Sequence, residues 1–254
     1  MAGSAVTIRP MVDGNGRRGK VAEVVARKIV HDIVERELPV GAKLPSEALM
    51  LEQLGVARAT LREALRLLEV QGLIAIRPGP GGGPVVAGAR SLAFGRTATL
   101  FFQMRGATFR ELNDARLILE PLMARLAAER QEEAGLERLA GSVATGREAE
   151  VADDPAWAQS SADFHGVVTS MSGNRILDLI AESLKEVWFD RVAGTAYEPE
   201  ERERVRKDHE AIAKAIATGN GTRAERLMRV HMEEFTAEVA SKYPGMMDEV
   251  VDWK

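Results

Sequence analysis

Apolar side chains recur at intervals of three or four residues along most of this chain, and this period predicts a mostly α-helical protein. Residues 21–37 form the first such segment. Its apolar stripe consists of Val21, Val24, Val25, Ile29 and Ile33. From residue 91 onward the pattern is helical throughout, and we expect helices over residues 92–105, 108–133, 137–151, 155–171, 175–192, 200–218 and 223–243. The short connections between these seven helices predict an antiparallel bundle.

Residues 44–73 predict two short helices joined by a tight turn. Ser46 is placed to cap the first helix, and Gly55 supplies the backbone freedom that the turn needs. The apolar stripe of the second helix consists of Leu61, Leu65 and Leu68. Its other faces carry Arg58, Thr60 and Arg62. A helix that is buried on one side and carries arginines on the other suits the DNA major groove, although a charged surface helix in an ordinary bundle has the same pattern.

The segment that follows favours the DNA-binding interpretation. Residues 73–77 are typical of a short strand, and residues 78–84 are a turn made almost wholly of Gly and Pro. Val85 and Val86 can return as a second strand. A helix-turn-helix followed by a β-hairpin is a winged helix, so we expect Gly81 at the hairpin tip to approach the minor groove or the DNA backbone.

Charge and composition limit the possible classes of protein. Residues 1–90 carry a net charge of +4 and residues 91–254 a net charge of −8, which suits a nucleic-acid-binding part joined to a part of another kind. The chain has no cysteine, which excludes disulfides and thiolate metal sites. No apolar stretch is long enough to span a membrane, and the first residues lack the apolar core of a signal peptide. We therefore expect a cytoplasmic protein with no membrane partner.

Three of the four histidines fall on separate helices of the predicted bundle. They are His165, His209 and His231, whereas His31 lies on the first helix of the N-terminal part. Three imidazoles that converge inside a bundle can bind Zn²⁺ or a similar ion. Spacing alone does not separate such a site from three unrelated histidines.

The motifs of the N-terminal part carry a specific resemblance. Leu-Pro-Ser-Glu at 44–47, Leu-Gly-Val-x-Arg-x-Thr-Leu-Arg-Glu-Ala-Leu at 54–65 and Arg-Pro-Gly at 77–79 closely resemble the DNA-binding domain of GntR-type bacterial transcription regulators. The resemblance covers roughly residues 19–86. It implies that double-stranded DNA is contacted by Arg58, Thr60, Arg62, Ser46 and Gly81. Ala57 and Ala59 stand where Ser or Thr is usual, which predicts a changed operator or affinity.

The C-terminal part resembles the FCD ligand-binding domain of the FadR branch of these regulators. The matching motifs include Phe-Arg-Glu-Leu at 109–112, Ala-Arg-Leu-x-Leu-Glu-Pro at 115–121, and Phe-His at 164–165 with Ser-Gly-Asn at 172–174. The resemblance implies a divalent metal bound by an Asp and three His, of which His165, His209 and His231 are present. Zinc is the expected ion, with nickel and manganese as alternatives.

The fourth metal ligand departs from the family pattern. Ser161 stands four residues before His165, where the family has Asp, and Asp163 lies on the opposite side of the helix. We therefore expect a weaker three-histidine site or a pocket without metal. The resemblance also implies that Arg116 faces the effector, and Ser161 is expected to line the same site; the alternative for Arg116 is an exposed pair with Glu120. Asn174 follows Gly173 at a helix junction, where we expect it to cap the next helix, with an effector contact as the alternative.

These observations predict a ligand-responsive transcriptional regulator, by expectation a repressor, that binds a palindromic operator as a homodimer. The effector is a carboxylate or a fatty acyl compound. The predicted parts are a flexible arm (1–18), a winged helix (19–88), a linker with the first bundle helix (89–107), an effector-binding and dimerisation domain (108–243) and a tail (244–254). The alternatives are a three-histidine metalloenzyme and a DNA-binding protein without effector.

Overall fold

The structure is a computed structural model that describes residues 17–79, 81–87, 91–149, 154–192 and 197–252. The chain divides into two compact units, residues 1–93 and 94–254, which are described separately. Helices make up nearly all regular structure in these residues, and the described strands form a single antiparallel pair.

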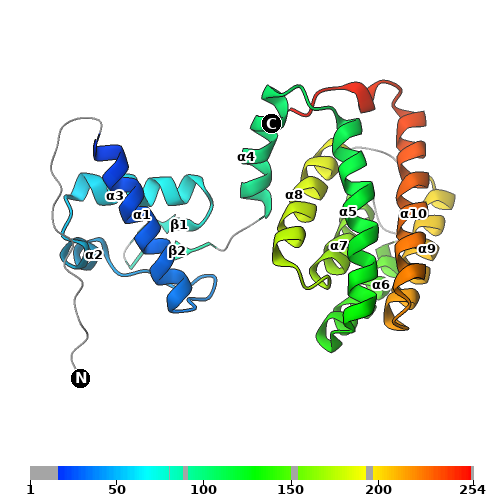
Figure 1. The fold of residues 1–254 in the computed structure, drawn as a ribbon, viewed down its shortest axis with the longest axis horizontal. Helices are drawn as coiled ribbons and strands as arrows, with labels where there is room; N and C mark the ends of the chain where they lie inside the picture. The colour runs from blue at the N-terminus through cyan, green and yellow to red at the C-terminus, as the bar shows by residue number, and fades with distance from the viewer. Residues whose placement is uncertain (1–16, 80, 88–90, 150–153, 193–196, 253–254) are drawn as a thin grey trace. The chain divides into compact units, whose positions relative to one another are not determined.

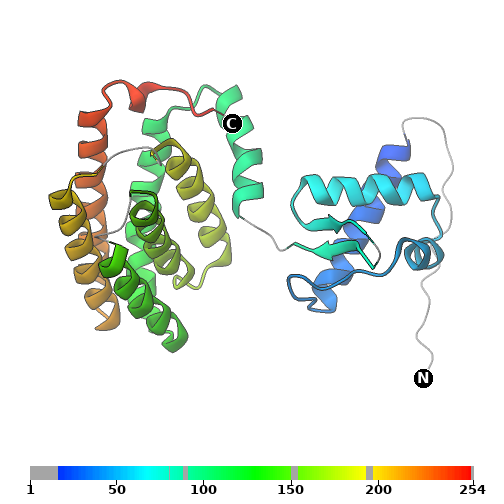
Figure 2. The same cartoon turned by 180° about the vertical axis from the view of Figure 1, so that it is seen from behind.

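The N-terminal unit is a winged helix-turn-helix. Its elements are α1 (Arg17–Glu35), α2 (Glu47–Leu54), α3 (Arg58–Val70), β1 (Ile74–Arg77) and β2 (Gly83–Val86). The two strands pair with Ile74 opposite Val86, and the view from behind shows the hairpin clearly (Figure 2). The stripe predicted on α3 is fully buried and packs against α1, so the apolar core of this unit is the one that the sequence period predicts.

Local signals end and begin the helices where the sequence places them. The Ser46 hydroxyl accepts a hydrogen bond from the backbone N–H of Leu49 at 3.3 Å, and this bond caps α2. Gly55 has φ of 63°, a left-handed conformation that turns the chain sharply into α3. Both predictions are confirmed. Because α1 begins at Arg17, the predicted arm at residues 1–18 is two residues too long, and its other residues lie outside the described ranges.

The C-terminal unit is a helical bundle built around α5 (Phe109–Arg130). The other helices are α4 (Ser91–Met104), α6 (Glu133–Ala149), α7 (Asp154–Ser170), α8 (Arg175–Val192), α9 (Pro199–Ala217) and α10 (Gly221–Lys242). α5 contacts α7, α8, α9 and α10, and Figure 1 shows α5 and α10 side by side. All seven predicted helices are present, and their ends differ from the predicted ends by four residues at most.

Two details of the bundle differ from the sequence prediction. α5 ends at Arg130 and not at residue 133, because Gln131 takes a left-handed conformation with φ of 53°. The residues predicted as a tail include a short 3-10 helix, Met246–Asp248. Met246, Met247 and Val251 are buried, and the Phe109 N–H bonds to the Glu249 carbonyl. These residues belong to the domain core, since their apolar side chains cover the first turn of α5.

Candidate functional site

The exposed face of α3 carries the residues predicted to contact DNA. Arg58 and Arg62 are exposed and lie four residues apart, while Thr60 is half-buried. The Arg62 Nε lies 3.3 Å from a carboxylate oxygen of Glu47 on α2, and both side chains of this pair are exposed. The N-cap residue Ala57 offers no side-chain hydrogen bond to the free amides of the first turn. Both guanidiniums therefore lie on an exposed face of α3 that is distinct from its buried stripe.

The tip of the hairpin is held by a lysine from outside the wing. The Lys43 ammonium donates a hydrogen bond of 2.9 Å to the Gly81 carbonyl. Gly81 is exposed and has φ of 77°, which a side chain would strain. The tip is thus ordered by a cation that itself remains exposed beside it. Ser46 is exposed too, but its hydroxyl already serves the cap of α2.

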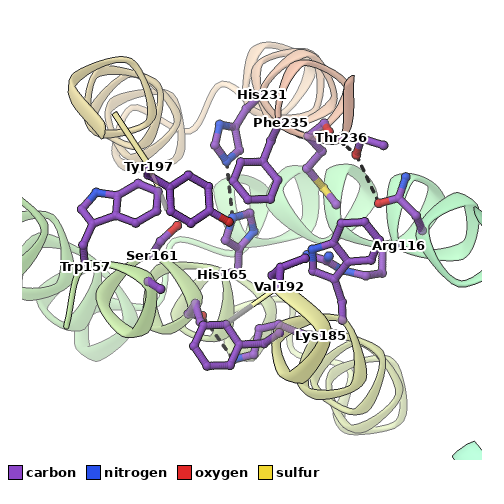
Figure 3. A pocket seen from close by; sticks show the side chains of 16 residues that line it. Arg116, Trp157, Ser161, His165, Lys185, Val192, Tyr197, His231, Phe235 and Thr236 are labelled. Atoms are coloured by element: carbon purple, nitrogen blue, oxygen red, sulfur yellow. Dashed lines mark hydrogen bonds between the residues drawn. The ribbon is translucent and has the colours of Figure 1, made fainter. Parts of the chain in front are cut away.

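A cavity opens inside the bundle between α5, α7, α8 and α10. The centres of water-sized molecules can occupy about 50 Å³ of this cavity. Its polar and charged lining residues are Asn113, Arg116, Ser161, His165, Lys185, Tyr197, His231 and Thr236 (Figure 3). Its aromatic walls are Trp157, Trp188, Phe189, Tyr197 and Phe235, which are five of the chain's 12 Phe, Trp and Tyr residues. No carboxylate lines it among the residues that the structure describes.

Three buried histidines converge beside this cavity. The Nε2 atoms of His209 and His231 are 3.3 Å apart, and those of His231 and His165 are 3.4 Å apart. All three rings offer a nitrogen within 4.8 Å of the others. His209 is held by the Phe164 ring, which stacks on it with centroids 3.9 Å apart. The sequence prediction that these three residues come together is therefore met by the geometry.

Two carboxylates fix the orientation of two of these rings. The Nδ1 of His165 lies 2.6 Å from Glu120, and the Nδ1 of His231 lies 3.2 Å from Asp208. With the ring proton on Nδ1 in both, the lone pairs of both Nε2 atoms point into the cluster. Burial lowers the pKa of His165, and burial with the neighbouring His231 and His165 lowers the pKa of His209 further. His165 and His209 are thus neutral near pH 7, and a neutral imidazole is the form that binds metal.

Glu120 links the histidine cluster to Arg116. Both residues are nearly inaccessible, and the Arg116 Nε donates to Glu120 at 2.7 Å. Burial alone would raise the pKa of Glu120, but Arg116 and His165 outweigh it and lower that pKa to about 2. Arg116 also lies over the Trp188 ring, with its Cζ 5.4 Å from the centroid. Arg116 therefore lines the cavity and also pairs with Glu120, as the two alternatives predicted. The pair is buried, however, and not exposed as expected.

Two of the three nitrogen separations in the histidine cluster fit a tetrahedral divalent ion. Zinc–nitrogen bonds of about 2.0–2.1 Å at tetrahedral angles separate the ligand nitrogens by about 3.3–3.4 Å. The two Nε2 separations have these values. Unmetallated rings with lone pairs turned toward one another repel, so a cation at this point would relieve the cluster. The donor set is all-nitrogen, which favours zinc or nickel over calcium or magnesium.

Comparisons with known proteins agree with this architecture. A model of "Bacterial regulatory proteins, gntR family" matches residues 21–82, and a model of the FCD domain matches residues 111–234. The HTH-type transcriptional regulator Mce2R of Mycobacterium tuberculosis is 30% identical over 213 residues, which cover 82% of this chain and 87% of that protein. The chain belongs to the GntR family of transcription regulators, in the FCD branch.

Other family members match over similar lengths. LutR of Bacillus subtilis, a transcriptional regulator, is 29% identical over 77% of this chain and 90% of its own length. A solved structure, Streptococcus agalactiae GntR, covers 85% of this chain and 99% of its own, at 28% identity and a TM-score of 0.64. The chain is therefore a DNA-binding transcriptional regulator with a ligand-binding domain. None of the described helices has the length and apolarity to cross a bilayer.

The remaining predicted site residues divide between the cavity and the surface. Ser161 lines the cavity together with His165 (Figure 3). Asp163 is exposed and bonds to Gln159, so it faces away from the histidines as predicted. Asn174 does not line the cavity: its Oδ1 accepts the N–H groups of Ile176 and Leu177 at the start of α8. The expected capping role of Asn174 is therefore confirmed, and its alternative role in the effector pocket stays a prediction.

Sequence analysis did not identify three residues that shape the site. The sequence pattern predicts Glu120 only as an exposed partner of Arg116. It assigns no role to Asp208 or Lys185. The available signal was the position of Asp208, one residue before His209, and of Glu120 within the same motif as Arg116. Neither position indicates which charged residues turn inward.

Proposed function

We propose that this regulator represses transcription by binding a two-fold-symmetric operator as a homodimer, and that a small anionic effector in the bundle cavity changes its DNA affinity. The observation that carries the proposal is a cavity with two cations and a histidine cluster in the same chain as a recognition helix. A single recognition helix and wing contact too few base pairs for useful specificity, which supports a dimer. Ligands of this kind typically shift affinity by about 5- to 150-fold.

On the DNA side, we assign base recognition to Arg58 and Arg62. Each guanidinium can donate two hydrogen bonds to a guanine edge. Thr60 and Ser46 serve backbone phosphates, and Gly81 brings the wing close to the minor groove. All five residues lie on one unit, and all but the half-buried Thr60 are exposed, which supports the assignment.

On the ligand side, His165, His209 and His231 would hold a divalent ion, with zinc preferred. When bound, the ion supplies a Lewis acid that attracts an anionic group of the effector. Ser161 cannot add a charged ligand, so its hydroxyl is left to contact water or effector. Arg116 faces the same cavity and offers its terminal nitrogens to a carboxylate.

The size of the cavity favours a compact effector over a fatty acyl compound. A cavity in which the centres of water-sized molecules can occupy about 50 Å³ holds a few water molecules. A long acyl chain would require the aromatic walls to move apart. We therefore favour a small carboxylate.

We also propose that the protein is a cytoplasmic regulator without enzymatic activity. The relatives bear the names of transcriptional regulators, which supports this class. The alternative of a catalytic three-histidine zinc site predicts turnover of a bound substrate.

The test is to isolate the operator by selecting duplex DNA from a random pool with the purified full chain. Metal content is then measured, and DNA affinity is compared for chelator-treated and zinc-loaded protein with small carboxylates. We expect about one metal per chain, and weaker DNA binding when metal and carboxylate are both present. Ser161→Asp should raise zinc affinity, because it adds an anionic ligand beside His165. No selected sequence, or no uptake of metal by either protein, would contradict the corresponding half of the proposal.

A further inference from the structure

The strongest observation outside the histidine cluster is a lysine in the wall of the cavity. Lys185 projects from α8, and only 9% of the residue is exposed. Its ammonium lies 2.9 Å from Glu182 and donates to the Ala162 carbonyl at 3.2 Å. Buried lysines are rare because burial of the charge is costly, so a buried lysine in a ligand cavity requires an explanation.

The packing around this lysine keeps it at the cavity. A side chain at position 166 would place its Cβ 2.8 Å from Glu182 and 2.9 Å from the Lys185 ammonium, so the ion pair lies directly against the bare backbone of Gly166. Glu182 also accepts a hydrogen bond from Thr169 at 3.3 Å. The Thr169 hydroxyl, which also lies 3.1 Å from the Gly166 carbonyl, can donate its one proton to Glu182 when Lys185 turns toward a ligand.

Both cations of the cavity retain capacity for further bonds. An ammonium has three donors, and the described partners of Lys185 use two of them. Arg116 uses Nε for Glu120, and its terminal nitrogens have no hydrogen-bond partner in the part of the chain that the structure describes. The carboxylates that balance these cations, Glu120 and Glu182, do not line the cavity. Both cationic residues therefore line the cavity and keep donors that their described partners do not use.

We propose that the effector is a short dicarboxylate, with one carboxylate at Arg116 and the other at Lys185, and that Lys185 determines the preference for two acidic groups over one. This inference rests on the proposed effector role of the cavity. A divalent ion on three neutral imidazoles would leave two positive charges for the effector to neutralise. Asn113, Ser161 and Thr236 supply neutral hydrogen bonds, and the small volume limits the ligand to a few carbons.

The experiment compares acids of equal carbon number by titration calorimetry on the full chain, chelator-treated and zinc-loaded. Succinate is paired with butyrate, and glutarate with pentanoate. We expect each diacid to bind at least about tenfold more tightly than its partner, since a second charge-assisted contact is gained. Equal affinities within each pair, or no binding of any of the four acids, would overturn the proposal.

The variant Lys185→Met keeps the apolar stem and removes the charge. It should reduce the preference for diacids to about threefold or less, because diacid affinity falls by more than monoacid affinity. Lys207→Met, at an exposed lysine of α9, is the matched control and should retain the preference. An equal loss for both classes of acid would show that Lys185 is structural and would overturn its assigned role.

A second variant guards against misfolding of Lys185→Met. Glu182→Gln leaves the lysine charged but weakens its ion pair, so the preference for diacids should persist or increase; its loss would contradict the proposal. Binding to the selected operator is measured on the same samples. If DNA binds but the acid pairs are equal, only this inference fails. If no DNA binds, the proposed regulatory function fails regardless of which acids bind.

Discussion

The two units of this chain place their functional charges in opposite environments. In the winged helix the core is wholly apolar and the cations face water, with the Arg62 side chain 64% exposed. In the bundle the functional charges are internal, with Glu120 1% and Arg116 6% exposed. DNA is a long anionic surface and must be met from outside, whereas a small effector is enclosed. The bundle therefore places charges where their removal affects folding, and the winged helix does not.

The largest expected effect is on the buried ion pair of α5. Glu120→Ala leaves Arg116 buried and unpaired, which should lower the free energy of unfolding of the bundle by about 3–5 kcal/mol. All three tryptophans lie in this unit, so urea denaturation followed by tryptophan fluorescence reports on it alone.

The same helix offers a matched control. Arg125 and Glu129 have the same spacing and the same contact distance of 2.7 Å, but both are about half exposed. Glu129→Ala should leave the denaturation curve nearly unchanged, because water screens the pair. If Glu120→Ala and Glu129→Ala have the same free energy of unfolding, burial of the charged pair does not contribute to the stability of the bundle.

The second effect belongs to the recognition helix. Arg58→Ala and Arg62→Ala should each weaken binding to the selected operator by about 1–3 kcal/mol and leave tryptophan-detected stability unchanged. Arg223→Ala removes an equally exposed charge from the bundle and should not alter DNA affinity. Intact operator binding by both α3 variants would show that the recognition helix is wrongly assigned.

The third effect concerns the carboxylate that orients His231. Asp208→Asn weakens the hold on Nδ1, and zinc affinity should fall by about 10- to 100-fold in a chelator competition assay. His31→Ala, at an exposed histidine outside the cluster, is the control and should bind zinc as the natural chain does. An unchanged zinc affinity in Asp208→Asn would mean that packing alone orients the ring.

The smallest expected effect concerns the N-terminus of α3 in the winged helix. Ala57→Ser supplies the missing cap of α3 and should stabilise the winged helix by about 1 kcal/mol, measured by hydrogen exchange of the α3 amides. Ala59→Ser places the same hydroxyl inside the first turn, where it cannot cap, and should give no gain. Equal exchange rates in the two variants would contradict the capping argument.

Most of the fold follows from short-range signals in the sequence. The cap at Ser46, the turn at Gly55 and the apolar stripe of α3 all depend on neighbours within a few residues, and each is present in the structure. The helices of the bundle were equally accessible from periodicity. The packed C-terminal segment was not, because Met246, Met247 and Val251 show no helical period of their own.

The sequence by itself determined the winged helix, the helical bundle, the family and the three histidines, since each depends on local pattern or on a motif. Only the tertiary structure decided which polar side chains turn inward. Asn113, Arg116 and Glu120 are buried on α5 among its apolar residues, and Lys185 is buried on α8. Periodicity assigns polar residues to the surface, whereas a cavity exists only where several helices meet. The direction of such a residue is therefore fixed by contacts distant in sequence, as in the 45 residues that separate Glu120 from His165.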